Sequence, residues 1–289
     1  MRHYSISEVE SLTGLSAHVL RVWERRYAFL KAKRTETNIR YYTDSQLAKL
    51  LNVSILLDRG MKISQIAKLT DKEIGATVLD NQTNADLSQN DTIKLLTSAT
   101  LKLDEFAICT LLEKAINSKG ILKTVLELIY PFLHHIGLLW TSGNAMPAQE
   151  HFVSALIVQK LHAAIDKLPQ VSSNEDAFVL LLLEEEEHEL GLLLSWFLLR
   201  KNGIKVYYLG QKVPMENLET VLKISGAKNV FTFFVLEPKG HVLKSLVRCK
   251  KKFDVKIFYA GRKAAGLNEV STHLELPSDL IKMIENQKK

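Results

Sequence analysis

The hydrophobic positions of the first seventy residues repeat at helical spacing, and capping residues precede each run. Ser5 and Glu8 form the Ser-x-x-Glu pattern of a capping box, which predicts a short helix that ends at Gly14. Ser16 is placed to cap a second helix, whose apolar side chains face inward while its arginines face outward. Residues 31–42 then have the basic, partly aromatic pattern of a β-ribbon. The pattern predicts two short helices followed by a hairpin wing.

Helical spacing continues after the wing. Thr43 begins a second capping box, with a helix expected through Leu57 and another at 64–69. Residues 76–91 are polar and predict a linker. Four helices are then expected, at 92–102, 104–118, 120–140 and 147–168. Their lengths suit an antiparallel four-helix bundle, followed by a second polar linker at 170–176.

The last part of the chain alternates between short apolar runs and amphipathic segments. Strands are expected at 177–183, 205–209, 229–236 and 256–260, with helices at 188–201, 215–225, 241–251 and 277–287. This alternation predicts a parallel sheet with helices on both faces, the Rossmann-like or flavodoxin-like arrangement. The chain is therefore expected to be multidomain, α and α/β, with divisions at 1–75, 76–172 and 173–289.

The net charge of +6 is concentrated at one end of the chain. Residues 1–70 hold 12 Lys and Arg against 6 Asp and Glu, a difference of +6, whereas the rest holds 26 of each. A basic module attracts a polyanion. With the helix-helix-wing order, the charge predicts a winged helix-turn-helix that binds double-stranded DNA, and the alternative is a basic surface without a specific partner.

Side chains on the second helix and the wing are the candidate DNA contacts. Arg21 and Arg25 lie one helical turn apart and can reach the same run of phosphates. Tyr42 is expected either to donate to a phosphate or to pack the wing, and the same two roles apply to Tyr41. The full set of candidates is Arg21, Arg25, Arg26, Arg34, Arg40, Tyr41 and Tyr42.

Neither a membrane span nor a signal peptide is indicated. The apolar runs are too short or too interrupted to cross a bilayer, and polar residues follow Met1. A cytoplasmic location without a membrane partner is therefore expected. Cys109 and Cys249 have no metal-type spacing and are expected to be reduced thiols.

A second candidate site follows the first strand of the α/β part. His188 lies at the carboxyl end of that strand, where ligands of such sheets bind, and a neutral imidazole is a good ligand for cobalt. Glu186 is placed to orient the imidazole, and Gly191 lets a planar group approach the backbone. The alternative interpretation is an acidic, solvated loop with a capping histidine.

Three motifs together resemble a known family. Segments 4–8, 20–27 and 34–42 are similar to the MerR family, whose members bind as dimers to inverted-repeat sites. Glu186, His188 and Gly191 match the Glu/Asp-x-His-x-x-Gly signature of cobalamin-binding domains, in which the histidine binds cobalt below the corrin. The order of these motifs resembles cobalamin-sensing MerR-type regulators, including light-responsive repressors that use adenosylcobalamin.

The helical part carries the third motif of that family. Trp140, nine intervening residues, and then Glu150 and His151 resemble the Trp-x9-Glu-His motif of the bundle that covers the upper corrin face. The resemblance implies that these three residues line the cofactor cavity. Without it, Trp140 is more commonly a core residue. Thr141 stands where light-responsive members can carry a second histidine, which favours cobalamin sensing over photoreception.

Two positions depart from the family pattern. Where cobalamin domains have a small hydroxyl residue at the end of the third strand, this chain has Phe233, and Ala260-Gly261 replaces a Gly-Gly pair after the fourth. Both places accommodate the nucleotide tail of the cofactor, so Phe233 is expected to crowd the tail while His188 is kept. Gly261 remains a candidate cofactor contact.

The resulting hypothesis is a transcriptional repressor that senses cobalamin and forms a homo-oligomer on DNA. A second hypothesis keeps the DNA-binding head but makes the C-terminal half a cofactor-free oligomerisation or partner-binding module. An enzymatic role, as the cobalamin-carrier subunit of a mutase or methyltransferase, is disfavoured because such carriers do not need a basic helix-turn-helix.

Overall fold

The computed structural model describes residues 4–27, 29–35, 38–80, 88–141, 147–172, 176–183, 186–235, 238, 240–263 and 271–287. The contacts of the chain form two compact units, residues 1–157 and 158–289, and the division falls inside one helix. Within the described ranges, no helix is both long enough and apolar enough to cross a membrane.

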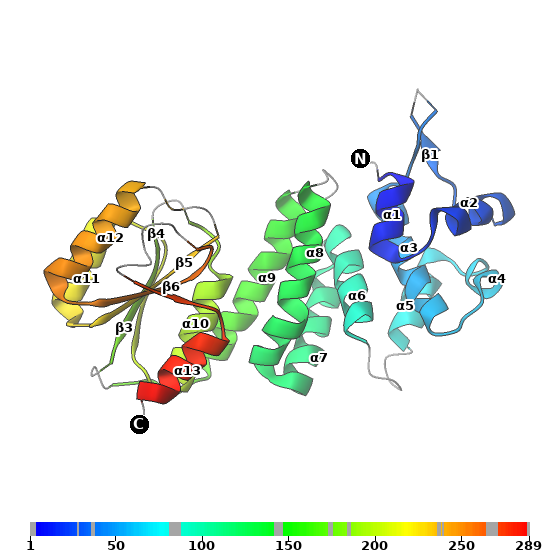
Figure 1. Ribbon diagram of the computed structural model, residues 1–289. Helices are drawn as coiled ribbons and strands as arrows, with labels where there is room; N and C mark the ends of the chain where they lie inside the picture. Colours follow the sequence, from blue (N-terminus) through cyan, green and yellow to red (C-terminus); the bar gives the residue numbers. More distant parts are fainter. Residues whose placement is uncertain are drawn as a thin grey trace. The chain divides into compact units, whose positions relative to one another are not determined.

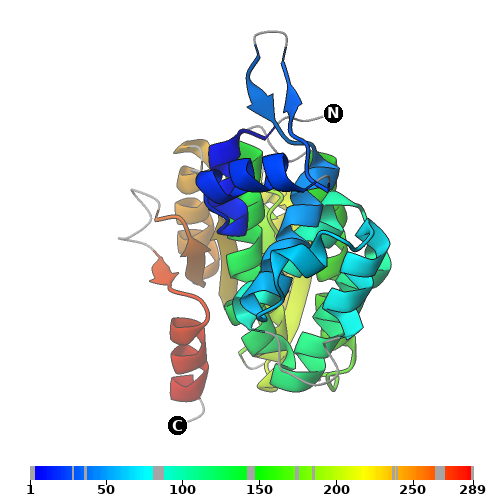
Figure 2. The same cartoon turned by 90° about the vertical axis from the view of Figure 1, so that its right-hand side faces the viewer.

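The first unit begins with the predicted order of helix, helix and wing. Its elements are α1 (Ile6–Thr13), α2 (Ala17–Arg26), β1 (Lys33–Arg34), β2 (Arg40–Tyr41) and α3 (Asp44–Asp58). The capping boxes at Ser5 and Thr43 both form, and Gly14 ends α1 in the left-handed conformation. The two strands pair antiparallel in a hairpin that projects from the helices (Figure 2). These local signals were therefore sufficient to predict the winged helix-turn-helix.

Helix α3 is followed by α4 (Ile63–Ile66) and α5 (Asp71–Asp80). The second of these extends into residues 76–91, so the prediction that the linker begins at 76 was wrong. Ile74 and Val78 are buried one turn apart, and α5 packs against α3. The Arg59 Nη1 group donates to the Val78 carbonyl at 3.1 Å. Burial of Ile74 and Val78 stabilises α5, although the polar residues around its end had predicted a linker.

The helical bundle consists of α6 (Gln89–Leu101), α7 (Glu105–Thr124), the π-helix η2 (Val125–Ile129), α8 (Tyr130–Thr141) and α9 (Pro147–Asp166). Gly120 has a positive φ of 77° and interrupts α7, which confirms the break expected between the helices at 104–118 and 120–140. The helix after Gly120 contains the π-helical stretch η2 before α8. Helix α6 packs against α3 of the head. There the Lys94 ammonium lies 2.8 Å from the Asp58 carboxylate, and Ser98 donates to the Ala48 carbonyl.

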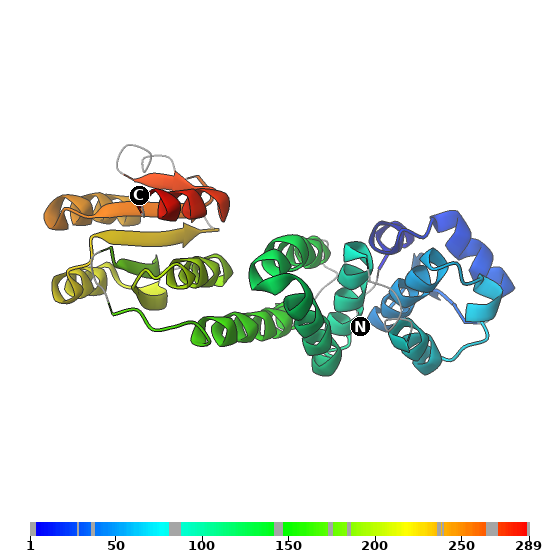
Figure 3. The ribbon, with the colours of Figure 1, turned by 90° about the horizontal axis from the view of Figure 1, so that it is seen from below.

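A segment without helix or strand, described through residue 172, follows α9 (Figure 3). Arg200 holds its beginning, because the guanidinium donates to the carbonyls of Leu168, at 3.0 Å, and Pro169, at 3.2 Å. The elements that follow are β3 (Phe178–Leu183), α10 (Leu190–Lys201), β4 (Val206–Val213), α11 (Met215–Ser225), β5 (Asn229–Phe234), α12 (Gly240–Phe253), β6 (Lys256–Gly261), β7 (Thr272–Leu274) and α13 (Ser278–Gln287).

The five strands form one parallel sheet in the order β4-β3-β5-β6-β7. This is the flavodoxin-like order, and it confirms the predicted fold class. Helices α11 and α12 cover one face of the sheet, and α10 and α13 cover the other (Figure 1). The sequence analysis missed β7, because three residues are too short to show a strand pattern.

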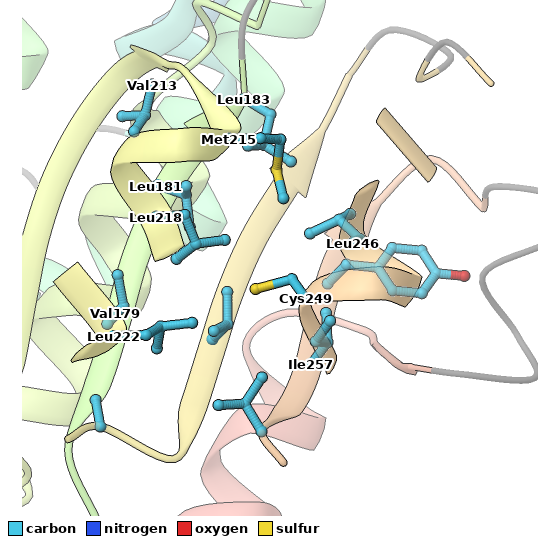
Figure 4. Packing of buried hydrophobic residues seen from close by; sticks show 14 of the residues in the cluster. Val179, Leu181, Leu183, Val213, Met215, Leu218, Leu222, Leu246, Cys249 and Ile257 are labelled. Carbon is cyan, nitrogen blue, oxygen red and sulfur yellow. The ribbon is translucent and has the colours of Figure 1, made fainter. Parts of the chain in front are cut away.

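The core between the sheet and helices α11 and α12 is aliphatic (Figure 4). Val179 and Leu181 from β3 meet Leu218 and Leu222 from α11. Cys249 of α12 is buried in the same cluster, and burial raises the pKa of its thiol to about 11. The α/β part therefore has its own core, and the strand ends remain available for a site.

Candidate functional site

Helix α2 presents a basic surface. Arg21, Arg25 and Arg26 are exposed, whereas Leu20 and Trp23 of the same helix are buried. Two of the three arginines lie in the last turn, where positive charge is favoured by the helix dipole. The structure thus confirms the predicted inward and outward faces of this helix, and its exposed guanidinium groups suit contacts to phosphates.

The wing is attached to α2 through one carboxylate. Glu24 lies 3.1 Å from the Nε atom of Arg40 and accepts a hydrogen bond of 2.6 Å from the Tyr42 hydroxyl. Burial, and then Glu24, raise the pKa of Tyr42 above its ordinary range. Of the two roles expected for Tyr42, its burial and its partner support packing of the wing. The sequence analysis missed the contribution of Glu24.

The exposed part of the wing carries further cations. Arg34 is exposed and donates to the side-chain oxygen of Asn38 at 2.7 Å, and Asn38 adopts a left-handed φ of 65° at the turn. Lys33, which the sequence analysis did not select, is also exposed and pairs in register with the half-buried Tyr41. Lys33 and Arg34 are therefore exposed cations of the wing, whereas Arg40 contacts Glu24.

The cofactor motif lies at the carboxyl end of β3, next to β5. Because β3 and β5 are neighbours whose connecting chains leave in opposite directions, this edge is the topological switch point of the sheet. The Glu186 side chain is only 5% exposed, and it contacts the Nδ1 atom of His188 at 2.5 Å. The His188 side chain is 56% exposed. An imidazole held at Nδ1 by a carboxylate has Nε2 as the ring nitrogen for a metal.

The Glu186 carboxylate also organises the surrounding backbone. One oxygen accepts from the amides of Glu187 and His188, both at 3.1 Å, and the other accepts from the amide of Val235 at 2.8 Å. Val235 directly follows β5, so the carboxylate joins the loop after β3 to the end of β5. Sequence reasoning missed Val235, because a backbone donor leaves no mark in the sequence.

Two more carboxylates of this loop have partners on β4. Glu187 pairs with Lys212, and Glu189 accepts a hydrogen bond of 3.1 Å from the Tyr208 hydroxyl. Burial, followed by the charge of Glu189, raises the pKa of Tyr208 above its ordinary range. These contacts argue against a merely solvated acidic loop, because they restrain the backbone on both sides of His188.

The space beside Gly191 is not open. A Cβ atom on Gly191 would lie 2.4 Å from Cε2 of Phe233, and one on Gly261 would lie 3.1 Å from Cε1 of the same ring. The donor set at His188 fits the cobalt of a corrinoid, since the macrocycle would supply the other nitrogen ligands and the protein would need to provide only one imidazole. The expected space for a nucleotide tail does not fit, because Phe233 fills it.

The candidate residues of the bundle lie in α8 and α9. Trp140 belongs to the last turn of α8, and its side chain is outside the described part of the chain. Glu150 lies in the first turn of α9 and His151 directly follows it, and the two side chains approach to 3.2 Å. Ser154 donates to the other oxygen of Glu150 at 2.7 Å. These contacts orient Glu150 and leave His151 exposed.

Two family models match the chain. The model of the MerR HTH family regulatory protein matches residues 4–73, and the model of the B12 binding domain matches residues 92–164. The first match covers the two helices and wing of the head together with α3, α4 and the first residues of α5, and the second falls within the helical bundle.

Two transcriptional repressors of Myxococcus xanthus are similar over most of the chain. The chain is 33% identical over 222 residues to the HTH-type transcriptional repressor CarH, with 75% of this chain and 74% of CarH covered. It is 25% identical over 224 residues to the repressor CarA, with 74% and 70% covered.

A solved structure has a similar fold. The monomethylamine corrinoid protein of Methanosarcina barkeri matches with a TM-score of 0.52 and 14% identity, covering 69% of this chain and 100% of that one. This corrinoid protein and the present chain therefore have similar folds.

Proposed function

Because the chain belongs to the MerR-type transcriptional repressors with a B12 binding domain, and is therefore a DNA-binding regulator that senses cobalamin, we propose that His188 is its cobalt ligand. The observation that carries this proposal is the buried carboxylate of Glu186 on Nδ1 of an exposed imidazole. Such a carboxylate fixes the tautomer and increases the basicity of the other nitrogen. The relatives are regulators, so the cobalt site serves regulation rather than catalysis.

The residues of this chain prepare the site before the cofactor arrives. Glu186 orients His188, while the Glu187–Lys212 and Glu189–Tyr208 contacts restrain the loop that carries it. When bound, a corrinoid supplies a cobalt centre that accepts an imidazole and, in its adenosyl form, a cobalt–carbon bond that light cleaves. A preorganised ligand binds more tightly because less freedom is lost on binding.

We further propose that Trp140, Glu150 and His151 contact the upper face of the cofactor. Support comes from the spacing of the motif and from the match of the B12 binding domain model to this region. The proposal keeps a three-part division of the chain, with the first boundary moved from residue 75 to the end of α5 at Asp80 and the second kept at 172. The proposal includes light sensing through adenosylcobalamin. Thr141 stands where light-responsive members of the family can carry a second histidine, so this position bears on whether the chain senses light or only cobalamin.

On the DNA side, we propose that the arginines of α2 and the wing bind an inverted-repeat operator. The proposed phosphate contacts are the exposed Arg21, Arg25, Arg26 and Arg34, with Arg40 and Tyr41 at the base of the wing. Each phosphate contact is modest, so assembly of several heads in a homo-oligomer multiplies the affinity. Cofactor-dependent assembly in the cytoplasm would then connect corrinoid or light to repression.

An absorption experiment tests the cobalt ligand. The full chain is incubated in the dark with adenosylcobalamin, freed of excess ligand, and measured before and after illumination. We expect the wild-type chain to retain the corrinoid spectrum and His188→Ala to lose it. The matched control is His241→Ala, which removes an exposed histidine at the start of α12. Retention by His188→Ala equal to that of the wild type would contradict the proposed ligand.

A gel-shift experiment tests how the cofactor is used. We expect the chain to shift a duplex from its own promoter region, with mobility and affinity that change on loading with corrinoid and that respond to light if light is sensed. If no corrinoid is retained, and His188→Ala leaves DNA binding and oligomeric state unchanged, the C-terminal half is a cofactor-free interaction module instead.

A further inference from the structure

The ring of Phe233 lies between two glycine backbones. Gly191 belongs to the first turn of α10, and Gly261 is the last residue of β6, with a positive φ of 85°. A Cβ atom added to Gly191 would lie within 2.8 Å of three atoms of the Phe233 ring. The absence of side chains at both glycines therefore makes room for this ring within the protein itself.

The same ring is adjacent to the loop that carries the cobalt ligand. Gly191 follows His188 by three residues, and Phe233 precedes Val235 by two. Val235 donates its amide to the carboxylate that orients His188. Phe233 is thus placed near the loop that carries the proposed cobalt ligand, where β5 packs against α10.

The covalent structure of cobalamin sets a requirement at this position. Its nucleotide tail hangs from the lower face of the corrin, the face to which His188 is proposed to bind. An imidazole on cobalt displaces the base of the tail, which must then enter the protein beside the ligand loop or remain in water. In this chain the space next to Gly191 is occupied, so the tail enters only if the Phe233 ring leaves.

Resting on the proposed corrinoid site, we propose that Phe233 selects against the nucleotide tail, and that the site favours incomplete corrinoids of the cobinamide class. If the tail displaces the Phe233 ring into water, the association constant of the corrinoid is lowered by about tenfold or more. This loss of affinity applies only to complete cobalamin, because cobinamide has no nucleotide tail. Phe233 is thus a specificity-determining residue, while His188 and Glu186 serve both ligands.

The test compares two corrinoids on the full-length chain and two variants. Aquacobalamin and diaquacobinamide are titrated in the dark, and the absorption change gives a dissociation constant for each. The ratio of the two dissociation constants in one protein includes the free energy of displacing the tail base from cobalt. The comparison that tests the inference is therefore the change of this ratio between the wild type and each variant. Phe233→Ser opens the space, and Phe233→Leu keeps an apolar side chain of smaller size in case the serine variant is poorly folded.

We expect Phe233→Ser to strengthen aquacobalamin binding about tenfold or more and to leave diaquacobinamide binding within about threefold, with Phe233→Leu intermediate. If both corrinoids bind but neither substitution changes their ratio, this inference is overturned and the proposed function stands. If the wild type and both variants, shown to be folded, bind neither corrinoid, the proposed cobalt site itself is wrong. The two failures are therefore distinguishable.

Discussion

The carboxylate of Glu186 accepts a hydrogen bond of 2.8 Å from the backbone amide of Val235, which lies 49 residues further along the chain. The same carboxylate contacts the imidazole of His188 and is almost completely buried. One side chain therefore sets the position of the candidate cobalt ligand relative to the end of β5.

Replacing Glu186 with Gln is expected to weaken corrinoid binding by about 10- to 100-fold, because a metal-binding histidine loses the group that fixes its tautomer and orientation. Absorption titration with diaquacobinamide measures the change. The control is Glu216→Gln, which removes an exposed carboxylate in the first turn of α11 and is expected to change the affinity by no more than about twofold. Equal effects of the two substitutions would contradict an orienting role for Glu186.

The attachment of the wing to α2 is expected to depend on Glu24. Glu24→Gln removes the charge that pairs with Arg40 and weakens the hydrogen bond to the buried Tyr42, at a cost of about 1–2 kcal/mol. Amide hydrogen exchange over residues 4–42 of the full chain should become roughly 5–30-fold faster. Glu10→Gln, on the exposed face of α1, is the control. Unchanged exchange in Glu24→Gln would show that the wing is held by other contacts.

The arginines of α2 are expected to act through phosphates. Arg21→Ala and Arg25→Ala should each reduce the slope of the logarithm of affinity against the logarithm of salt concentration by about one. Fluorescence anisotropy with an operator duplex between about 50 and 200 mM salt measures this slope. Lys72→Ala changes an exposed lysine of α5 and should leave the slope unaltered. A slope that survives both arginine substitutions would remove these residues from the interface.

Two glycines with similar backbone angles should respond differently to alanine. Gly261 and Gly203 have φ angles of 85° and 79°, but a Cβ atom on Gly261 would lie 2.2 Å from the Phe234 carbonyl oxygen, whereas one on Gly203 would meet nothing within 4 Å. Gly203→Ala should therefore cost about 1–2 kcal/mol of unfolding free energy from backbone strain alone. Gly261→Ala should cost about 2 kcal/mol more. Urea unfolding measures both, and equal losses would argue against a close approach at Gly261.

The two cysteines are expected to differ in reactivity. Burial raises the pKa of Cys249 to about 11, so its thiol stays protonated at pH 8, and the thiolate is the reactive form. Alkylation of the native chain at pH 8 should label the half-buried Cys109 and spare Cys249, as mass spectrometry can show. Both should react in denaturant. Labelling of Cys249 at the rate of Cys109 in the native chain would mean that α12 opens readily.

The DNA-binding head was largely predictable from the sequence, because its signals are local. The capping residues Ser5, Ser16 and Thr43 lie within three residues of the backbone amides they satisfy, so a short window contains both partners. The basic charge and the hydrophobic spacing of α2 are likewise read from consecutive residues. The end of the head was not predictable, since α5 extends to Asp80 only because Val78 packs beneath α3.

In the α/β part, the sequence by itself determined the alternation of strands and helices and the motif of Glu186, His188 and Gly191. Only the tertiary structure decided what surrounds that motif. Val235, Tyr208 and Lys212 reach it because parallel strands align their carboxyl ends, whatever the distance between them along the chain. The sequence showed a bulky Phe233, but its position between Gly191 and Gly261 depends on the pairing of β5 with β6 and on the packing of α10 against β5. Periodicity and capping act between near neighbours, whereas the shape of the site depends on contacts that exist only once the sheet has formed.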